Sequence, residues 1–173
     1  ESGRPELAVE SFEEARKLQD PTLRDVDIQI ADFWFSRQQW GRAREALEPI
    51  VSVVTGERQA GLALRLAEIC QNLRDYDAAE KYADMAEKLL AKTNPTIEML
   101  RAVSLVGRGE NALSAGDAVK ATEAFNKAIQ TFQRATELAP NNYIAWTGLA
   151  DAQRGMYLRT REAAMLMFCV WPQ

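Results

Sequence analysis

The feature of this sequence that most constrains its fold is an alanine-led pattern that occurs five times. In each instance the alanine at position i is followed by small or apolar residues at i+4 and i+7, which places all three side chains on one face of an α-helix. The leading alanines lie roughly 35 to 42 residues apart, a period typical of an array of repeated helical units. The five instances are Ala8/Phe12/Ala15, Ala43/Leu47/Ile50, Ala79/Ala83/Ala86, Ala121/Phe125/Ala128 and Ala163/Met167/Val170.

A second apolar stretch with helical spacing precedes each pattern after the first. These stretches contain Ile30/Ala31/Trp34, Leu66/Ala67/Cys70, Leu105/Gly109/Ala112 and Trp146/Leu149/Ala150. Short turns separate the two members of each pair, at residues 37–39, 73–75, 115–117 and 155–156, and Pro or Gly positions divide one pair from the next. The sequence therefore predicts helix–turn–helix pairs, about nine helices in all and no strand.

The third pair is predicted to be the longest, because about 42 residues separate Ala79 from Ala121 although the turn between the helices stays short. Its helices are expected to begin near Thr96 and to end near Ala139, so that Ile97 and Leu100 meet Phe132, Ala135 or Leu138. Large rings at apolar or post-turn positions are expected to fill the core. These rings are Trp34, Tyr76, Phe125 and Trp146.

Composition and charge argue against several classes of function. The chain contains no histidine, the commonest general base and metal ligand, and no residues in a metal-binding spacing, so we expect no catalytic, cofactor or metal site. A net charge of −4 disfavours binding to nucleic acid, and no apolar run predicts a membrane span.

Cys70 is expected to be a buried structural thiol, and a disulfide with Cys169 is not expected. The glycine-containing run 107–112 lies within a helical segment, which favours close helix packing at Gly109 over a dinucleotide loop.

The motifs of the paired segments resemble those of the tetratricopeptide repeat family. The family pattern is W-x2-L-G-x2-Y, then A-x3-F, then P. The corresponding motifs here are Trp146-x2-Leu149-Ala150, Leu66-Ala67-x2-Cys70 followed by Tyr76-x2-Ala79-x3-Ala83-x2-Ala86, and Ala121-x3-Phe125-x2-Ala128 leading to Pro140-Asn141-Asn142. Asp27 and Ala63 stand where the family has tryptophan, Arg108 and Gln153 replace apolar or aromatic residues, and some spacings exceed the family's 34 residues.

The resemblance implies an all-α array of helical hairpins forming a right-handed α-solenoid. We expect residues 1–173 to form a single array that is a fragment of a longer protein. It would consist of a half repeat at 5–20 and repeats at 24–57, 60–93, 95–140 and 143–171. Domains of this family generally bind peptides or proteins in a concave groove lined by their first helices, so the resemblance implies a non-catalytic interaction scaffold.

Four acidic residues are expected to face this groove, one from each first helix: Asp32, Glu68, Glu110 and Asp151. Such a ladder would favour ligands that carry lysine or arginine, although Arg65 and Arg154 would neutralise part of it, and a solvated helix face is the simpler explanation. Apolar groove positions are expected at Ile28, Leu64 and Val106. The acidic positions disfavour the subgroup of the family that clamps a chaperone's C-terminal carboxylate with Lys, Arg and Asn.

Two other functions remain open: self-association through the ends of the array, and a recruiting or regulatory arm of an enzyme outside this fragment. Leu7 and Phe12 would lack a covering first helix at one end. At the other end, residues 163–171 are apolar on every side, so we expect contact with further repeats or with a second copy. The sequence does not indicate a compartment.

Overall fold

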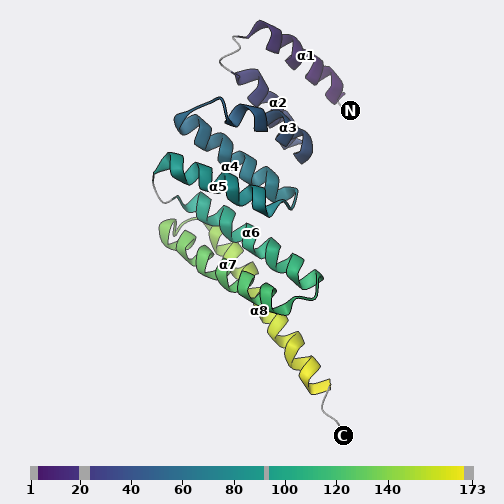
Figure 1. Ribbon diagram of the computed structural model, residues 1–173, viewed down its shortest axis with the longest axis vertical. Helices are drawn as coiled ribbons and strands as arrows, with labels where there is room; N and C mark the ends of the chain where they lie inside the picture. Colours follow the sequence, from purple (N-terminus) through teal and green to yellow (C-terminus); the bar gives the residue numbers. More distant parts are fainter. Residues whose placement is uncertain (1–3, 20–23, 92–93, 170–173) are drawn as a thin grey trace. The chain divides into compact units, whose positions relative to one another are not determined.

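The computed structural model describes residues 4–19, 24–91 and 94–169, with side chains as far as Leu158. The described residues form eight α-helices and no strand, which confirms the predicted all-α class. The helices fall into two compact units, Glu1–Ala91 and Lys92–Gln173. Figure 1 shows successive helices of each unit lying side by side. They are α1 (Pro5–Leu18), α2 (Asp25–Ser36), α3 (Trp40–Val51), α4 (Gly56–Asn72), α5 (Tyr76–Leu90), α6 (Pro95–Ser114), α7 (Ala118–Leu138) and α8 (Tyr143–Cys169).

Unit 1 contains two helical hairpins, α2–α3 and α4–α5, preceded by α1. The chain reverses at Gln38 and Arg74, whose φ angles of 58° and 60° lie in the left-handed region. Asp75 then caps α5 by accepting a hydrogen bond from the Ala78 amide at 3.1 Å. The predicted faces are buried in both hairpins: Ile30/Ala31/Trp34, Ala43/Leu47/Ile50, Leu66/Ala67/Cys70 and Ala79/Ala83/Ala86.

Helix α1 is the least buried element of unit 1. None of its residues is fully buried, and Leu7 is exposed. The Phe12 ring meets Phe33 of α2 edge-on, with 5.9 Å between ring centroids. Arg16 Nε lies 2.7 Å from the buried carboxylate of Asp27, the residue at a position where the family has tryptophan. An edge-on ring contact and an ion pair connect α1 to α2, and the amide of Val26 in α2 also donates to Gln19 Oε1 at the end of α1.

Unit 2 contains the longest hairpin, as predicted. Helices α6 and α7 have 20 and 21 residues, whereas α2 and α3 have 12 each. Asn94 caps α6 by accepting from the Thr96 amide, and Pro95 occupies its first turn, where a missing amide proton costs nothing. α7 runs to Leu138, and Ile97, Phe132 and Ala135 are all buried. The direct contact predicted between Ile97 or Leu100 and the end of α7 stays a prediction.

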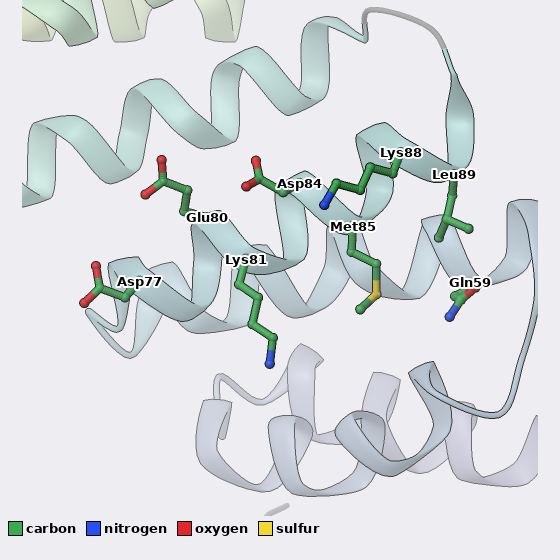
Figure 2. A pocket seen from close by; sticks show the side chains of 8 residues that line it. All are labelled: Gln59, Asp77, Glu80, Lys81, Asp84, Met85, Lys88 and Leu89. Carbon is green, nitrogen blue, oxygen red and sulfur yellow. The ribbon is translucent and has the colours of Figure 1, made fainter.

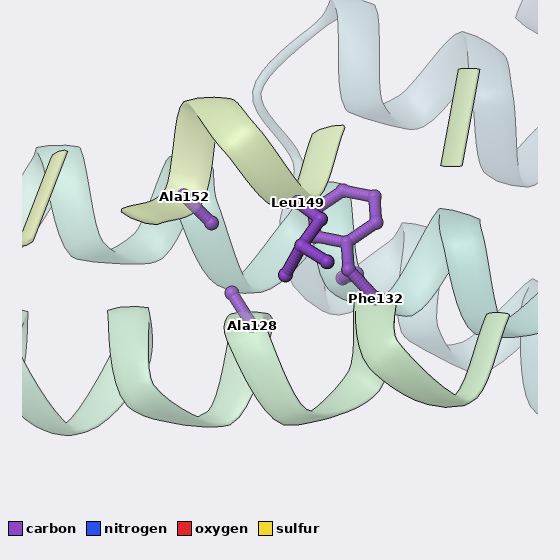
Figure 3. Packing of buried hydrophobic residues seen from close by; sticks show 5 residues of the cluster. Ala128, Phe132, Leu149 and Ala152 are labelled. Carbon is purple, nitrogen blue, oxygen red and sulfur yellow. The ribbon is translucent and has the colours of Figure 1, made fainter. Parts of the chain in front are cut away.

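Helix α8 packs on α7 by placing glycines against phenylalanine rings. A Cβ atom at Gly148 would lie 2.3 Å from the Phe132 ring, and one at Gly155 would lie 3.1 Å from the Phe125 ring. Gly109 of α6 approaches the same Phe125 ring, which confirms its predicted packing role. Figure 3 shows Phe132 and Ala128 of α7 beside Leu149 and Ala152 of α8, within a core that also includes Ala102 of α6.

The predicted turn at residues 155–156 is wrong, because α8 is one continuous helix of 27 residues. The described residues therefore contain eight helices where about nine were expected. Gly155 suggested a turn, yet it lies inside the helix, where the missing side chain leaves room for the Phe125 ring. Residues 163–171 were expected to form a separate second helix; the side chains of this segment lie outside the described residues, although its backbone continues α8 as far as Cys169.

Of the four rings expected in the core, Trp34 and Phe125 are buried and Tyr76 is half-buried. The expectation for Trp146 is wrong: it is 50% exposed, and its indole Nε1 donates to the Pro140 carbonyl at 2.8 Å. The buried face of α8 is instead Ala145, Leu149 and Ala152. Trp146 faces the side of α8 that a returning helix would cover, and the continuous α8 provides no such helix. Cys70 is fully buried with a free thiol, as predicted.

Candidate ligand-binding cavity between α6 and α8

A cavity of about 430 Å³ opens between the two first helices of unit 2, α6 and α8. Three of the seven predicted groove residues line it, namely Val106 and Glu110 from α6 and Asp151 from α8. They are neighbours because Val106 and Glu110 are one helical turn apart and α8 packs beside α6. The remaining lining residues are Leu113, Phe125, Arg154, Gly155 and Leu158.

The floor of this cavity is apolar. The buried Phe125 ring comes from α7, and the glycines on either side of it, Gly109 and Gly155, let it sit between α6 and α8. Val106 and Leu113 are half-buried on α6, and Leu158 is half-exposed on α8. This surface can accept the aliphatic part of a side chain from a ligand.

The rim of the cavity is charged. Arg154 lies 3.0 Å from Asp151 one turn earlier on α8, so this carboxylate is already paired. Glu110 is exposed and, among the residues that the structure describes, no cation pairs with its carboxylate. The cavity thus combines an apolar floor with one unpaired carboxylate and one carboxylate in an exposed ion pair.

The predicted groove residues of unit 1 are arranged differently. Asp32 of α2 forms an ion pair with Arg65 of α4, and the guanidinium of Arg65 also lies 4.9 Å from the centroid of the Phe35 ring. Ile28 and Leu64 are half-buried, and Glu68 is exposed. Arg65 therefore neutralises one step of the predicted ladder, as Arg154 does in unit 2.

Sequence reasoning missed a second ion pair beside this one, between Asp25 and Arg58. Both pairs join α2 to α4 across 33 residues of sequence. Asp25 and Asp32 are two helical turns apart, as are Arg58 and Arg65, so they share one face of each helix. This matched spacing is the signal that could have revealed the pairing.

A polar cluster connects α3 to the start and middle of α5 in unit 1. Arg44 Nη1 donates to Asp75 Oδ2 at 2.8 Å, and the buried Tyr82 hydroxyl donates to Glu48 Oε1 at 2.6 Å. The Arg44 hydrogen bond, together with the Ala78 amide, lowers the pKa of Asp75. The Tyr82 hydrogen bond lowers the pKa of Glu48, while burial and this same bond raise the pKa of Tyr82. These groups satisfy one another, which indicates a structural cluster.

Two other features do not form a site. A cavity of about 690 Å³ runs along α5, but Figure 2 shows Glu80 and Asp84 pointing to one side of the helix and Lys81 and Met85 to the other, so its polar groups do not converge. Burial raises the pKa of the Cys70 thiol to about 11, which makes it unreactive at neutral pH. Within the described ranges, no cluster of His, Cys, Asp or Glu could hold a metal ion, and no helix is long and apolar enough to cross a membrane.

Comparison with known families gives a match to the tetratricopeptide repeat over residues 113–142. This stretch contains the end of α6, the turn at Gly116, the whole of α7 and the Pro140-Asn141-Asn142 loop. The match supports the resemblance predicted from the sequence, and the residues that the structure describes form an all-α protein built of helical hairpins. Repeats of this kind generally act in protein–protein interaction. No curated protein matches the chain.

Proposed function

We propose that this chain is a non-catalytic scaffold that binds a peptide or a helix of a partner protein at the α6–α8 cavity. The observation that carries the proposal is the convergence of Val106, Glu110 and Asp151 on one cavity with the Phe125 ring at its floor. The tetratricopeptide match and the absence of histidine from the sequence support a binding role over a catalytic one.

The ligand group that fits this cavity is a lysine or arginine side chain. Its aliphatic stem would lie on Val106 and Phe125, and its charged end would reach Glu110 at the rim. The net charge of −4 adds a long-range attraction for basic ligands. Glu68 in unit 1 lies on a surface where Arg65 already provides a cation, so we assign the basic preference to unit 2.

The proposal is tested by selecting binders from a peptide library and measuring their affinities for matched variants. Glu110→Gln should weaken the selected peptides at least about fivefold, and raising the salt concentration should weaken the wild-type complex. Glu123→Gln, which removes the same charge from an exposed position on α7, should leave the affinity unchanged.

Val106→Ala tests the apolar half of the site and should also weaken binding. Peptides rich in lysine and arginine are the expected result of the selection. A selection without binders, or binders equally affected by Glu110→Gln and Glu123→Gln, would show that the cavity is not the binding surface.

A further inference from the structure

One face of α8 is exposed although its spacing matches a face that is buried in α4. In α4, Leu62, Leu66 and Ile69 are buried along one side and Ala63, Ala67 and Cys70 along the adjacent side. Two neighbours account for this, because α4 packs against both α3 and α5. Helix α4 is thus an example of a first helix with two buried sides, one of which is covered by the second helix of its own hairpin.

In α8 only the first of these sides is buried. Ala145, Leu149 and Ala152 repeat the spacing of Leu62, Leu66 and Ile69 and are buried. Leu149 and Ala152 lie in one cluster with Ala128 and Phe132 of α7. The residues that repeat the spacing of Ala63, Ala67 and Cys70 are all exposed. With two tyrosines on the same side they form the α8 stripe: Tyr143, Trp146, Ala150, Gln153 and Tyr157.

The distal part of α8 carries the sequence that covers such a face elsewhere in the chain. Ala163, Met167 and Val170 repeat the spacing of Ala79, Ala83 and Ala86, which line the buried side of α5. Because α8 is continuous as far as Cys169, this segment points away along the helix axis and cannot lie on the stripe of its own chain.

The register between α8 and α7 indicates where the backbone of α8 extends beyond α7. Gly148 and Gly155 of α8 face Phe132 and Phe125 of α7, so each step of seven residues along α8 moves seven residues back along α7. By this register α8 passes the first residue of α7, Ala118, near residue 162. Figure 1 shows the yellow end of α8 running past α6 and α7. An isolated helical segment shorter than about 12 residues is only marginally stable in water, so packing against another element would stabilise the part of α8 beyond residue 162.

We propose that two copies of the chain exchange these segments, so that residues 163–169 of each copy cover the α8 stripe of the other. One exchange satisfies both features, because the uncovered stripe and the segment with the covering pattern are on the same chain but cannot meet within it. Exchange of an identical element between two copies is a low-cost route to a symmetric dimer. This inference does not depend on the proposed peptide cavity, which lies on another side of α8.

Light scattering on the 173-residue chain across a concentration series provides the first test. We expect a mass of twice 19.4 kDa that falls toward 19.4 kDa on dilution. Ala150→Arg places a charge in the middle of the stripe and should raise the dimer dissociation constant at least about tenfold. Thr147→Arg makes a comparable change at an exposed α8 residue outside the stripe and should not. Both positions are exposed in the single chain, so circular dichroism should show unchanged helix content.

A second test identifies the occupant. A chain ending at Leu158 keeps the α6–α7–α8 packing and should be monomeric. In a Cys169→Ser background, the pair Ala150→Cys and Ala163→Cys should form disulfides between two chains. A wild-type chain that stays monomeric to high micromolar concentration, a disulfide that closes within one chain, or a dimer that persists without residues 159–173 would each overturn the proposal.

Discussion

Units 1 and 2 hold their neighbouring helices together by different means. In unit 1, charged and polar side chains link the hairpins: Asp25–Arg58 and Asp32–Arg65 join α2 to α4, and Tyr82 of α5 donates to Glu48 of α3. In unit 2, phenylalanine rings of α7 fit against glycines of α6 and α8.

This difference bears on where a ligand can bind. Arg65 of α4 pairs with Asp32 of α2 and lies over the Phe35 ring. In unit 1, the surface shared by these two first helices is therefore occupied by a side chain of the same unit. In unit 2, Arg154 pairs with Asp151 on the same helix, α8, and a cavity remains between α6 and α8. Helix packing through rings and glycines thus accompanies an open cavity between α6 and α8 in unit 2.

The largest expected effect is the loss of a ring from unit 2. Phe132 is 2% exposed and lies in a buried cluster with Leu149 and Ala152 of α8. Phe132→Ala should reduce the free energy of unfolding by about 3–5 kcal/mol. Chemical denaturation followed by circular dichroism measures this. A loss below about 1 kcal/mol would contradict the importance assigned to ring-and-glycine packing.

The same substitution is expected to have opposite signs at two glycines. Gly148→Ala forces a Cβ atom to within 2.3 Å of the Phe132 ring and should cost about 1–3 kcal/mol, because the ring or α8 must shift. Gly61→Ala in α4 meets no atom within 4 Å and should stabilise the chain by up to about 1 kcal/mol through helix propensity. Thermal midpoints of both variants provide the measurement. A stabilised Gly148→Ala would show that α8 does not approach α7 this closely.

These glycines also show what the sequence could and could not predict. Gly116 and Gly155 each follow an apolar helical segment, and both were predicted to form turns. Gly116 does so with a φ of 77°, whereas Gly155 lies within α8. A glycine next to a helix is compatible with either outcome, and the choice depends on whether a ring from another helix needs its space, which no local pattern contains. The burial of Trp146 was mispredicted for the same reason, since it required a turn at Gly155.

The sequence likewise predicted some features of the candidate site and not others. Val106, Glu110 and Asp151 meet at one cavity because the helix period and the hairpin repeat determine their positions. The ion pair of Asp32 depends on how far a side chain from the next repeat can reach, and the sequence alone gave Arg65 only as a possible partner. Periodicity therefore predicts which face a residue occupies, but pairing across repeats requires the distance between them.

A smaller effect is expected for the polar cluster of unit 1. Tyr82 is buried and its hydroxyl donates to a carboxylate, so Tyr82→Phe should cost about 1–2 kcal/mol. The Glu48 carboxylate is partly exposed and can regain water, which limits the loss. Hydrogen exchange should show weaker protection in α3 and α5 and unchanged protection in α7. A variant with wild-type protection throughout would show that the hydrogen bond contributes nothing measurable.

The smallest expected effect is the response of unit 1 to acid. Asp75 and Glu48 have pKa values below their ordinary range, the first mainly through Arg44 and the second mainly through Tyr82. Their contribution to stability is therefore present above the unfolded pKa, near 4, and is lost as the pH falls through the lower folded pKa. Because both carboxylates are partly exposed, we expect them to contribute at most about 1 kcal/mol to the free energy of unfolding.

Arg44→Gln should reduce the dependence of stability on acid pH in α3 and α5, whereas Arg134→Gln on the exposed side of α7 should not. Hydrogen exchange at pH 7 and near pH 3 compares the two variants, and an equal acid response in both would show that Arg44 does not hold the Asp75 carboxylate ionised.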